Sequence, residues 1–260
     1  MPTVARLSIA PVKSLGLQHP DEIALTETGV AEDRRFFLHD DTGRCVDRTI
    51  AGRLVQVSAR IDRDARRLRL TFPDGVVIDD EVRLGDAVVL NVYGETIHGH
   101  HVEGPWAEAL EPFAGRRVQL VRTDRPGMIH GRYPASIVSD GSLGLLGAHA
   151  GTGPVDARRF RMLIELEGGR AHEEDTWIGR RVEIGEAVLF VRKPVARCAI
   201  TTQDPDTGLR DLDTLRTIIG YRGLRDRDNV DFGVKGTVER PGTIRLGDRV
   251  TLLDAVPATA

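Results

Sequence analysis

Cys198 is the residue of this chain whose surroundings point most directly to chemistry. It follows an apolar run at Ala187–Phe190 that predicts a β-strand, and Pro194 is expected to end the strand and leave the cysteine on the turn beyond it. Lys193 and Arg197 place positive charge beside the thiol, which favours the thiolate. A thiolate can bind a soft or high-valent metal or act as a nucleophile, and a packed, inert cysteine is the alternative.

Three short segments carry groups that bind anions. Lys13 and Ser14 end the first predicted strand, and Arg34 opens another. Arg159 and Arg161 would share one face of a third strand. Each group alone is more typical of a solvated surface charge. Together they supply enough donors to hold a phosphate and a polar heterocycle.

A fourth candidate for anion binding lies at residues 139–143. Ser139 and Ser142 stand where a short helix is expected to begin. Hydroxyl groups and free backbone N–H groups at a helix start can hold an anion. This loop therefore joins the candidate site.

Three other polar clusters predict structure rather than a site. Asp204–Gly208 alternates acids as a calcium loop does, but Leu215 stands where such a loop carries glutamate. His98 and His100 would share one face of a strand without a third ligand. Glu173–Asp175 is simplest as an exposed loop anchored by the tryptophan that follows it.

Composition excludes several classes of protein. The chain has 260 residues, of which 40% are hydrophobic and 29% charged, as in an ordinary globular protein. The net charge of −3 argues against a nucleic-acid partner. No apolar run could span a bilayer and the first residues do not resemble a signal peptide, so we expect a cytoplasmic protein with no membrane association.

Two residue types are unusually distributed. Only Lys13, Lys193 and Lys235 are lysines, so the other 33 of the 36 basic residues are arginines. Arginine bias from a GC-rich genome is the simplest explanation, although guanidinium groups also suit phosphates and carboxylates. Cys45 and Cys198 lie far apart, without the spacing of zinc ligands, and a disulfide between them is not expected in the cytoplasm.

β-structure is expected to position these groups in both halves of the chain. A short stretch, a turn of glycine and an acid, and an aliphatic strand occur in sequence at residues 82–90, 182–190 and 244–252. Alternating apolar residues predict strands at 5–9 and 55–61, and a hairpin turn at 73–75. Helical spacing predicts three short helices, at residues 106–115, 142–147 and 212–220.

These patterns predict a mainly β fold, a β-rich α+β protein with few short helices and barrel-type sheets. The polar stretch Thr123–Tyr133, interrupted by glycine and proline, is expected to cross the surface between two domains. We place these domains at residues 1–115 and 116–260.

Taken in order, the motifs resemble the MOSC family, which includes the C-terminal domain of molybdenum-cofactor sulfurase, the mitochondrial amidoxime-reducing component and bacterial relatives. The resemblance covers nearly the whole chain and ends at Pro241–Asp248. It rests on Pro-Val-Lys-Ser, Asp-Arg before aromatics, Arg-Phe-Arg, Glu-Asp-Thr-Trp, and Arg-Cys followed by Thr-Thr-Gln-Asp-Pro-Asp-Thr-Gly. It implies an N-terminal MOSC β-barrel domain followed by a MOSC β-barrel domain, with the cofactor between them.

The resemblance also implies a site. By matching position, Cys198 would be the molybdenum ligand and the catalytic residue. The groups that would hold molybdopterin and its phosphate are Lys13, Ser14, Arg34, Ser139, Ser142, Arg161 and Arg197. The chain departs from the family pattern at Leu163, where relatives often carry asparagine, and at Val46–Thr49, which stands in place of Thr-Ala-Arg-Gln.

The function implied by the resemblance is reduction of small N-hydroxylated molecules with a molybdenum–molybdopterin cofactor. The sequence has neither an iron–sulfur cysteine cluster nor a glycine-rich nucleotide fingerprint. Electrons would therefore come from a separate donor protein that resembles a ferredoxin or a flavoprotein. Two alternatives stay open: a module that carries the cofactor, or a sulfur on Cys198, for another enzyme, and an interaction protein without a cofactor.

Overall fold

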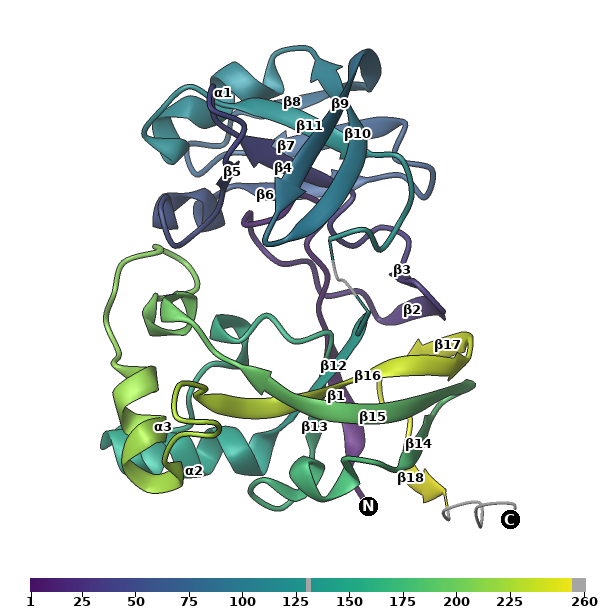
Figure 1. Ribbon diagram of the computed structural model, residues 1–260, viewed down its shortest axis with the longest axis vertical. Coiled ribbons are helices and arrows are strands. Elements are labelled where there is room, and N and C mark those ends of the chain that lie inside the picture. Colours follow the sequence, from purple (N-terminus) through teal and green to yellow (C-terminus); the bar gives the residue numbers. More distant parts are fainter. Residues whose placement is uncertain (130–131, 254–260) are drawn as a thin grey trace.

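The computed structural model describes residues 1–129 and 132–253. Within these residues strands dominate and the three α-helices are short, so the predicted mainly β fold is confirmed. The chain forms two lobes, one above the other in Figure 1, and each lobe has its own sheets and apolar core.

The lower lobe in Figure 1 is built on a seven-stranded sheet. In spatial order the strands are β1 (Thr3–Leu7), β13 (Ile164–Glu167), β12 (Ala135–Ser139), β16 (Asp231–Arg240), β15 (Ala187–Ala196), β14 (Arg181–Ile184) and β18 (Val250–Leu253). A second sheet beside it contains β17 (Gly242–Arg245), β2 (Glu22–Thr26) and β3 (Gly29–Val30). Their inward side chains bury one core, which includes Trp177.

The upper lobe contains a five-stranded and a three-stranded sheet. The first holds β5 (Cys45–Val46), β4 (Phe36–His39), β11 (Gln119–Thr123), β10 (Glu95–Glu103) and β9 (Arg83–Val92). The second holds β6 (Ser58–Ile61), β7 (Arg67–Thr71) and β8 (Val77–Glu81). The core between them includes Trp106, whose indole N–H donates to the carbonyl of Leu68 at 3.2 Å.

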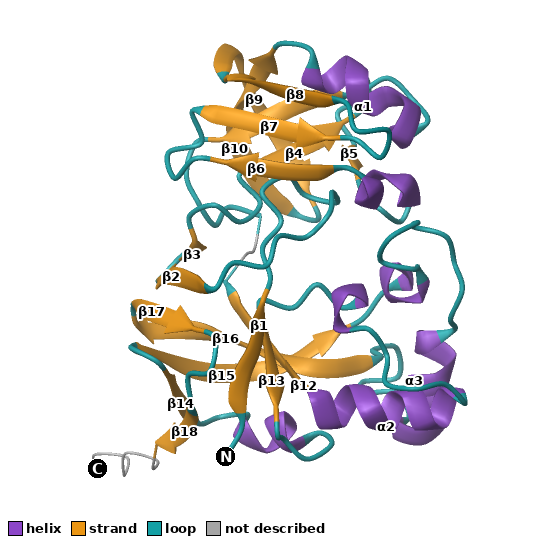
Figure 2. Ribbon diagram, turned by 180° about the vertical axis from the view of Figure 1, so that it is seen from behind, coloured by secondary structure: helices purple, strands orange, loops and turns teal. Residues whose placement is uncertain are grey.

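The chain passes between the lobes more than once. Strands β1, β2 and β3 come first in sequence but pair with β13 and β17 of the lower lobe, as Figure 2 shows from behind. Strand β11 follows residue 115 and yet belongs to the upper sheet. The limits 1–115 and 116–260 stay a prediction. The expected crossing at Thr123–Tyr133 includes His130 and Gly131, which lie outside the described residues.

The three α-helices lie close to their predicted places. α1 (Trp106–Ala114) ends at Gly115, whose φ of 68° is the left-handed conformation that stops a helix. α2 (Asp140–Ala150) begins earlier and ends later than expected, with Ser139 as its N-cap. α3 (Thr214–Arg222) continues through Gly220 instead of ending there. No helix among residues 1–129 and 132–253 combines the length and the apolar character needed to cross a membrane.

Four 3-10 helices complete the described structure: η1 (Gly52–Gln56), η2 (Ala157–Arg159), η3 (Glu173–Trp177) and η4 (Ala199–Thr202). Two of them correct the strand predictions. η1 occupies the beginning of the stretch expected to be extended from residue 55. η2 stands where Arg159 and Arg161 were expected to share a strand face. The rest of the first stretch is extended as expected, since Ser58–Ile61 forms β6, whereas the alternation at Arg159 and Arg161 falls on a turn and not on a strand.

Two further expectations were wrong in detail. The first of the three expected glycine turns, at Gly85, lies inside β9, where the pairing with β10 is irregular. The other two turns are confirmed: Gly185 joins the paired strands β14 and β15, and Gly247 lies between β17 and β18, which belong to different sheets. Pro194 does not end β15, because irregular pairing with β16 on either side of it accommodates the missing N–H.

Candidate functional site

A cleft of about 240 Å³ opens between the lobes, and both lobes contribute to its walls. From the first part of the chain come Lys13, Ser14, Arg34 and Arg48. The later part contributes Ser136, Arg159–Met162, Val195–Cys198, Ile200, Thr201 and Lys235. The structure thus brings Lys13, Ser14, Arg34, Arg161, Arg197 and Cys198 of the predicted site together around one space.

Cys198 is an exposed free thiol at the cleft wall. It lies two residues after the end of β15 and caps η4, as expected for a residue on the turn leaving a strand. Its backbone carbonyl accepts from the amide and the hydroxyl of Thr201, at 3.2 and 3.1 Å. These bonds hold the backbone while the sulfur faces the space, so an inert, packed cysteine does not describe this residue.

Arg197 supplies a fixed positive charge next to Cys198. Its guanidinium donates to the carbonyls of Phe232 and Phe160, at 2.8 and 3.0 Å, and contacts the sulfur of Met162 at 2.7 Å. Burial lowers the pKa of this guanidinium to about 9. Because its nitrogens already contact the chain, Arg197 is better suited to hold charge beside the thiolate than to bind a cofactor directly.

Arg48 and Arg161 each leave one buried donor without a partner. Arg48 has no exposed surface, and its Nε donates to the Gln203 side chain at 3.2 Å. Arg161 donates through Nη2 to the carbonyl of Leu15 at 2.9 Å. The Nη1 atom of each arginine is buried and has no hydrogen-bond partner among the described residues.

These two unpartnered donors are costly. A buried polar group without a partner costs about 1–3 kcal/mol, and a charged one costs more. Burial is the main cause that lowers the pKa of Arg48 to about 10, and it lowers the pKa of Arg161 as well. An anion in the cleft would satisfy both donors and offset both charges.

The N-terminal wall is held in an unusual backbone conformation. The amide of Lys13 donates to the carbonyl of Phe36, and that of Arg34 to the carbonyl of Ala10, each at 2.8 Å, so two chain segments lie side by side. Ser14 and Arg34 have φ values of 77° and 51°. Left-handed backbone at residues other than glycine is typical of sites whose surroundings enforce it.

The lysines lie over tyrosine rings. Lys13 stands 4.9 Å from the ring centre of Tyr93, while Lys193 and Lys235 stand 4.8 and 5.5 Å from that of Tyr133. Burial is the main cause that lowers the pKa of Lys13. The chain has only three lysines, and all three lie in or beside the cleft: Lys13 and Lys235 line it, and Lys193 pairs with Lys235.

Ser139 and Ser142 are a correction to the predicted site. Neither lines the cleft, and both are buried. Their hydroxyls donate to the carboxylate of Glu174, at 2.8 and 2.7 Å. The anion that the start of α2 was expected to bind is thus a side chain of the protein itself. Burial raises the pKa of Glu174, which is the cost of placing it there.

Sequence reasoning did not select Arg48 or Lys235, although both line the cleft. Arg48 stands in the segment that departs from the family pattern, so the resemblance did not assign it to the site. Lys235 could have been found from the rarity of lysine, because the chain has only three lysines. No group of three or more metal-binding side chains from histidine, cysteine, aspartate and glutamate occurs among the described residues.

Known proteins resemble this chain over almost its full length. The family model described as "MOSC domain" matches residues 95–251, and "MOSC N-terminal beta barrel domain" matches residues 1–102. Mitochondrial amidoxime-reducing component 1 of Mus musculus is 27% identical, covering 96% of this chain and 82% of the relative. Mitochondrial amidoxime reducing component 2 of Homo sapiens is 29% identical, covering 95% and 82%.

Two more distant similarities complete the comparison. Molybdenum cofactor sulfurase of Caenorhabditis briggsae is 26% identical over 90% of this chain, which corresponds to 33% of that protein. The crystal structure of the YUAD protein from Bacillus subtilis covers 96% of this chain and 94% of its own, with a TM-score of 0.46 and 14% identity.

Proposed function

This chain belongs to the MOSC family, and from its cleft we propose that it binds a molybdenum–molybdopterin cofactor with Cys198 as the protein ligand of the metal. The observation that carries the proposal is the pair of buried, unpartnered donors on Arg48 and Arg161, lining the same cleft as an exposed thiol. A phosphate fits such donors, and a thiolate fits molybdenum.

Different residues of the cleft would bind different parts of such a cofactor. Arg48 and Arg161 would receive its phosphate, and Lys13, Ser14 and Arg34 would contact the pterin from the N-terminal wall. Arg197 would place its positive charge beside the sulfur that binds the metal. The segment at Val46–Thr49 departs from the family pattern but still supplies Arg48 to the cleft.

When bound, the cofactor would supply two-electron oxygen-atom transfer, chemistry that the side chains cannot perform themselves. We propose reduction of small N-hydroxylated molecules such as amidoximes, the substrate class named in the relatives. The N–O bond breaks, two electrons and two protons are consumed, and the oxygen leaves as water. Electrons would come from a separate protein that resembles a ferredoxin or a flavoprotein, and the expected cytoplasmic location stays a prediction.

Metal analysis tests the proposal directly. Protein made in a host that synthesises the cofactor should carry about one molybdenum per chain and reduce benzamidoxime with a chemical electron donor. Cys198→Ser should lose the metal and the activity while its melting temperature in the metal-free form changes little. Cys45→Ser is the matched control, because Cys45 is buried in the upper lobe and should leave the metal in place. Metal-free wild type from such a host would contradict the proposal.

A carrier of sulfur or of the cofactor is the second candidate function. The exposure of Cys198 favours it, because a sulfur to be passed on must be reachable by another protein. Mass spectrometry distinguishes the two: a persulfide on Cys198 without molybdenum would support the carrier, and molybdenum with benzamidoxime reduction would support the enzyme.

A further inference from the structure

Beside the cleft, the outer face of the lower sheet carries a group of cations that we call the basic strip: Arg192, Lys193 and Lys235, with Tyr133 between the two lysines. Lys193 and Lys235 are directly opposite each other on β15 and β16. Arg192 lies over the ring of Phe190 at 4.0 Å. Tyr133 and Phe190 thus give the strip two aromatic contacts among its charges.

The strip differs from the other charged surfaces of the molecule. Many of the arginines form ion pairs, such as Arg181 with Glu239 at 2.6 Å. None of the three cations in the strip has a carboxylate partner among the described residues, and Arg192 donates only to a threonine hydroxyl. The chain as a whole is negative, so this positive surface is a local feature and does not follow from composition.

Placing two lysines opposite each other opposes folding. Like charges directly across a strand pair are destabilising. Burial, and then the charges of Lys193 and Arg197, lower the pKa of Lys235. The tyrosine ring between them offsets part of this repulsion. An arrangement that costs stability and is left without a carboxylate is typical of a surface that binds a negative partner.

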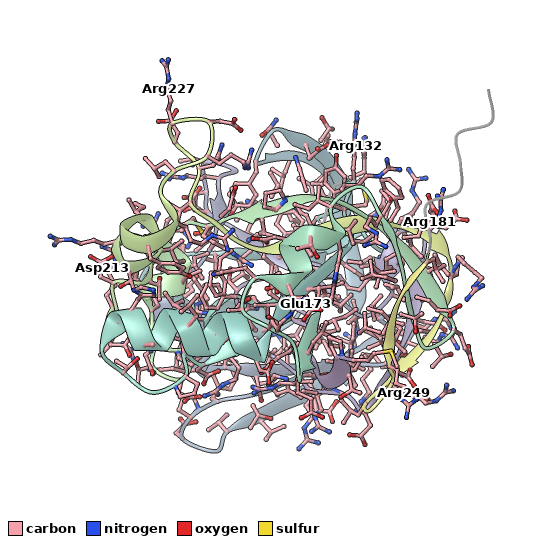
Figure 3. The ribbon with its side chains drawn as sticks, turned by 90° about the horizontal axis from the view of Figure 1, so that it is seen from below. Arg132, Glu173, Arg181, Asp213, Arg227 and Arg249 are labelled. Atoms are coloured by element: carbon pink, nitrogen blue, oxygen red, sulfur yellow. The ribbon has the colours of Figure 1, made fainter. Side chains whose placement is uncertain are left out.

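The strip is continuous with the cleft. Lys235 belongs to both, since it lines the same space as Cys198. On its other side it pairs across the sheet with Ser136, another residue of the cleft wall. Figure 3 shows Arg132, which precedes Tyr133, and Arg249 toward opposite edges of the molecule. A macromolecule bound to the strip would therefore lie at the mouth of the site.

We infer that the basic strip docks the acidic face of the electron-donor protein, an inference that rests on the proposed function. Each turnover needs two electrons from outside the chain, and a one-electron carrier must dock and leave twice. A few unpaired cations at the mouth of the cleft favour fast, weak, salt-sensitive docking rather than permanent assembly. The strip is too short, and the chain too negative, to favour a nucleic acid.

The test measures how fast holoenzyme with benzamidoxime oxidises a reduced plant-type [2Fe–2S] ferredoxin. For wild type, the second-order rate constant should fall about tenfold from low to high salt. Arg192→Glu and Lys193→Glu should each lower it several-fold at low salt and weaken its salt dependence. Arg249→Glu is the control with the same charge change, because Arg249 is exposed and its backbone pairs with Thr3, outside the basic strip.

A chemical donor separates this inference from the proposed function. With reduced methyl viologen, Arg192→Glu should reduce benzamidoxime at the wild-type rate, since Arg192 does not line the cleft. If that reaction proceeds but ferredoxin oxidation responds equally to Arg192→Glu and Arg249→Glu, the docking surface lies elsewhere and the inference fails. If single-stranded DNA binds wild type and binds Arg192→Glu less well, the basic strip is a nucleic-acid site and the inference fails. Absence of molybdenum and of viologen-driven activity would overturn the proposed function itself.

Discussion

Two places in this molecule gather hydrogen-bond donors of the kind that bind anions, and they differ in one respect. At the start of α2, the hydroxyls of Ser139 and Ser142 surround the carboxylate of Glu174. In the cleft, Arg48 and Arg161 each keep a buried nitrogen without a partner among the described residues. The donors of the first place are satisfied within the fold, whereas one donor on each arginine of the second has no partner among the described residues.

The difference teaches how a structural anion site is distinguished from a functional one. Both places carry donors and both are buried, so residue type and burial do not separate them. Satisfaction does. Donors that a side chain of the same chain already fills stabilise the fold, whereas charged donors left unfilled beside a cleft favour the binding of an anion.

Removing the internal anion should have the largest effect on stability. In Glu174→Ala the two serine hydroxyls and the Ser139 amide lose a buried acceptor, so the free energy of unfolding should fall by roughly 3 kcal/mol. Chemical denaturation of the metal-free protein measures this. Molybdenum content of the folded variant should match wild type, and a selective loss of the metal would show that the α2 start belongs to the site after all.

Removing a cleft arginine should have the opposite effect: it should lower the retention of molybdenum and leave the stability of the metal-free protein unchanged. Arg161→Met takes away an unpaired buried charge, so the metal-free protein should unfold no more easily than wild type. Retention of molybdenum should fall about tenfold or more, because a charge-assisted hydrogen bond to phosphate is worth about 1.5–3 kcal/mol.

Inorganic phosphate is the probe for that loss. At ten times its dissociation constant it should stabilise the metal-free wild type by about 1.4 kcal/mol. It should not protect Arg161→Met. Equal protection of both proteins would place the anion elsewhere.

The pH dependence of stability should show the smallest difference. Burial raises the pKa of Glu174 above its ordinary value, so between the two values the folded state holds more protons than the unfolded state. The contribution of this group is therefore fully present below the unfolded pKa and is lost as pH rises through the folded one. The slope is at most about 1.4 kcal/mol per pH unit.

Glu174→Gln isolates this contribution, because its amide does not titrate. The free energy of unfolding should be measured for both proteins from acid to neutral pH. As pH rises, the wild type should lose stability relative to Glu174→Gln. A constant difference would mean that the carboxyl does not titrate over this range in the folded protein.

Much of the candidate site could be predicted from the sequence because its groups are of rare chemical type. A thiol that closely follows two cations and a set of guanidinium groups can be recognised without knowing the fold, and the cleft contains Cys198, Arg34 and Arg161. Arg48 could not be chosen in this way, since arginines are common in this chain. Among the described residues it shares with Arg161 alone, of all the arginines, a buried nitrogen that has no hydrogen-bond partner.

The helices and the paired turns followed from local rules, and the exceptions have local causes. Gly115 ends α1 because a left-handed residue stops a helix, whereas Gly220 lies within α3 and Gly223 follows its end. Pro194 remains within β15 because irregular pairing accommodates it. Capping and pairing depend on neighbours that a short sequence window does not contain.

The sequence by itself determined the mainly β fold, the family and the chemical types available for a site, because periodicity and side-chain chemistry are properties of the chain. Only the tertiary structure decided which donors meet. Glu174 reaches Ser139 across 35 positions, and Gln203 reaches Arg48 across 155. Whether a buried donor is satisfied depends on atoms distant in sequence, and that property separates the fold's own anion from the place left for a ligand.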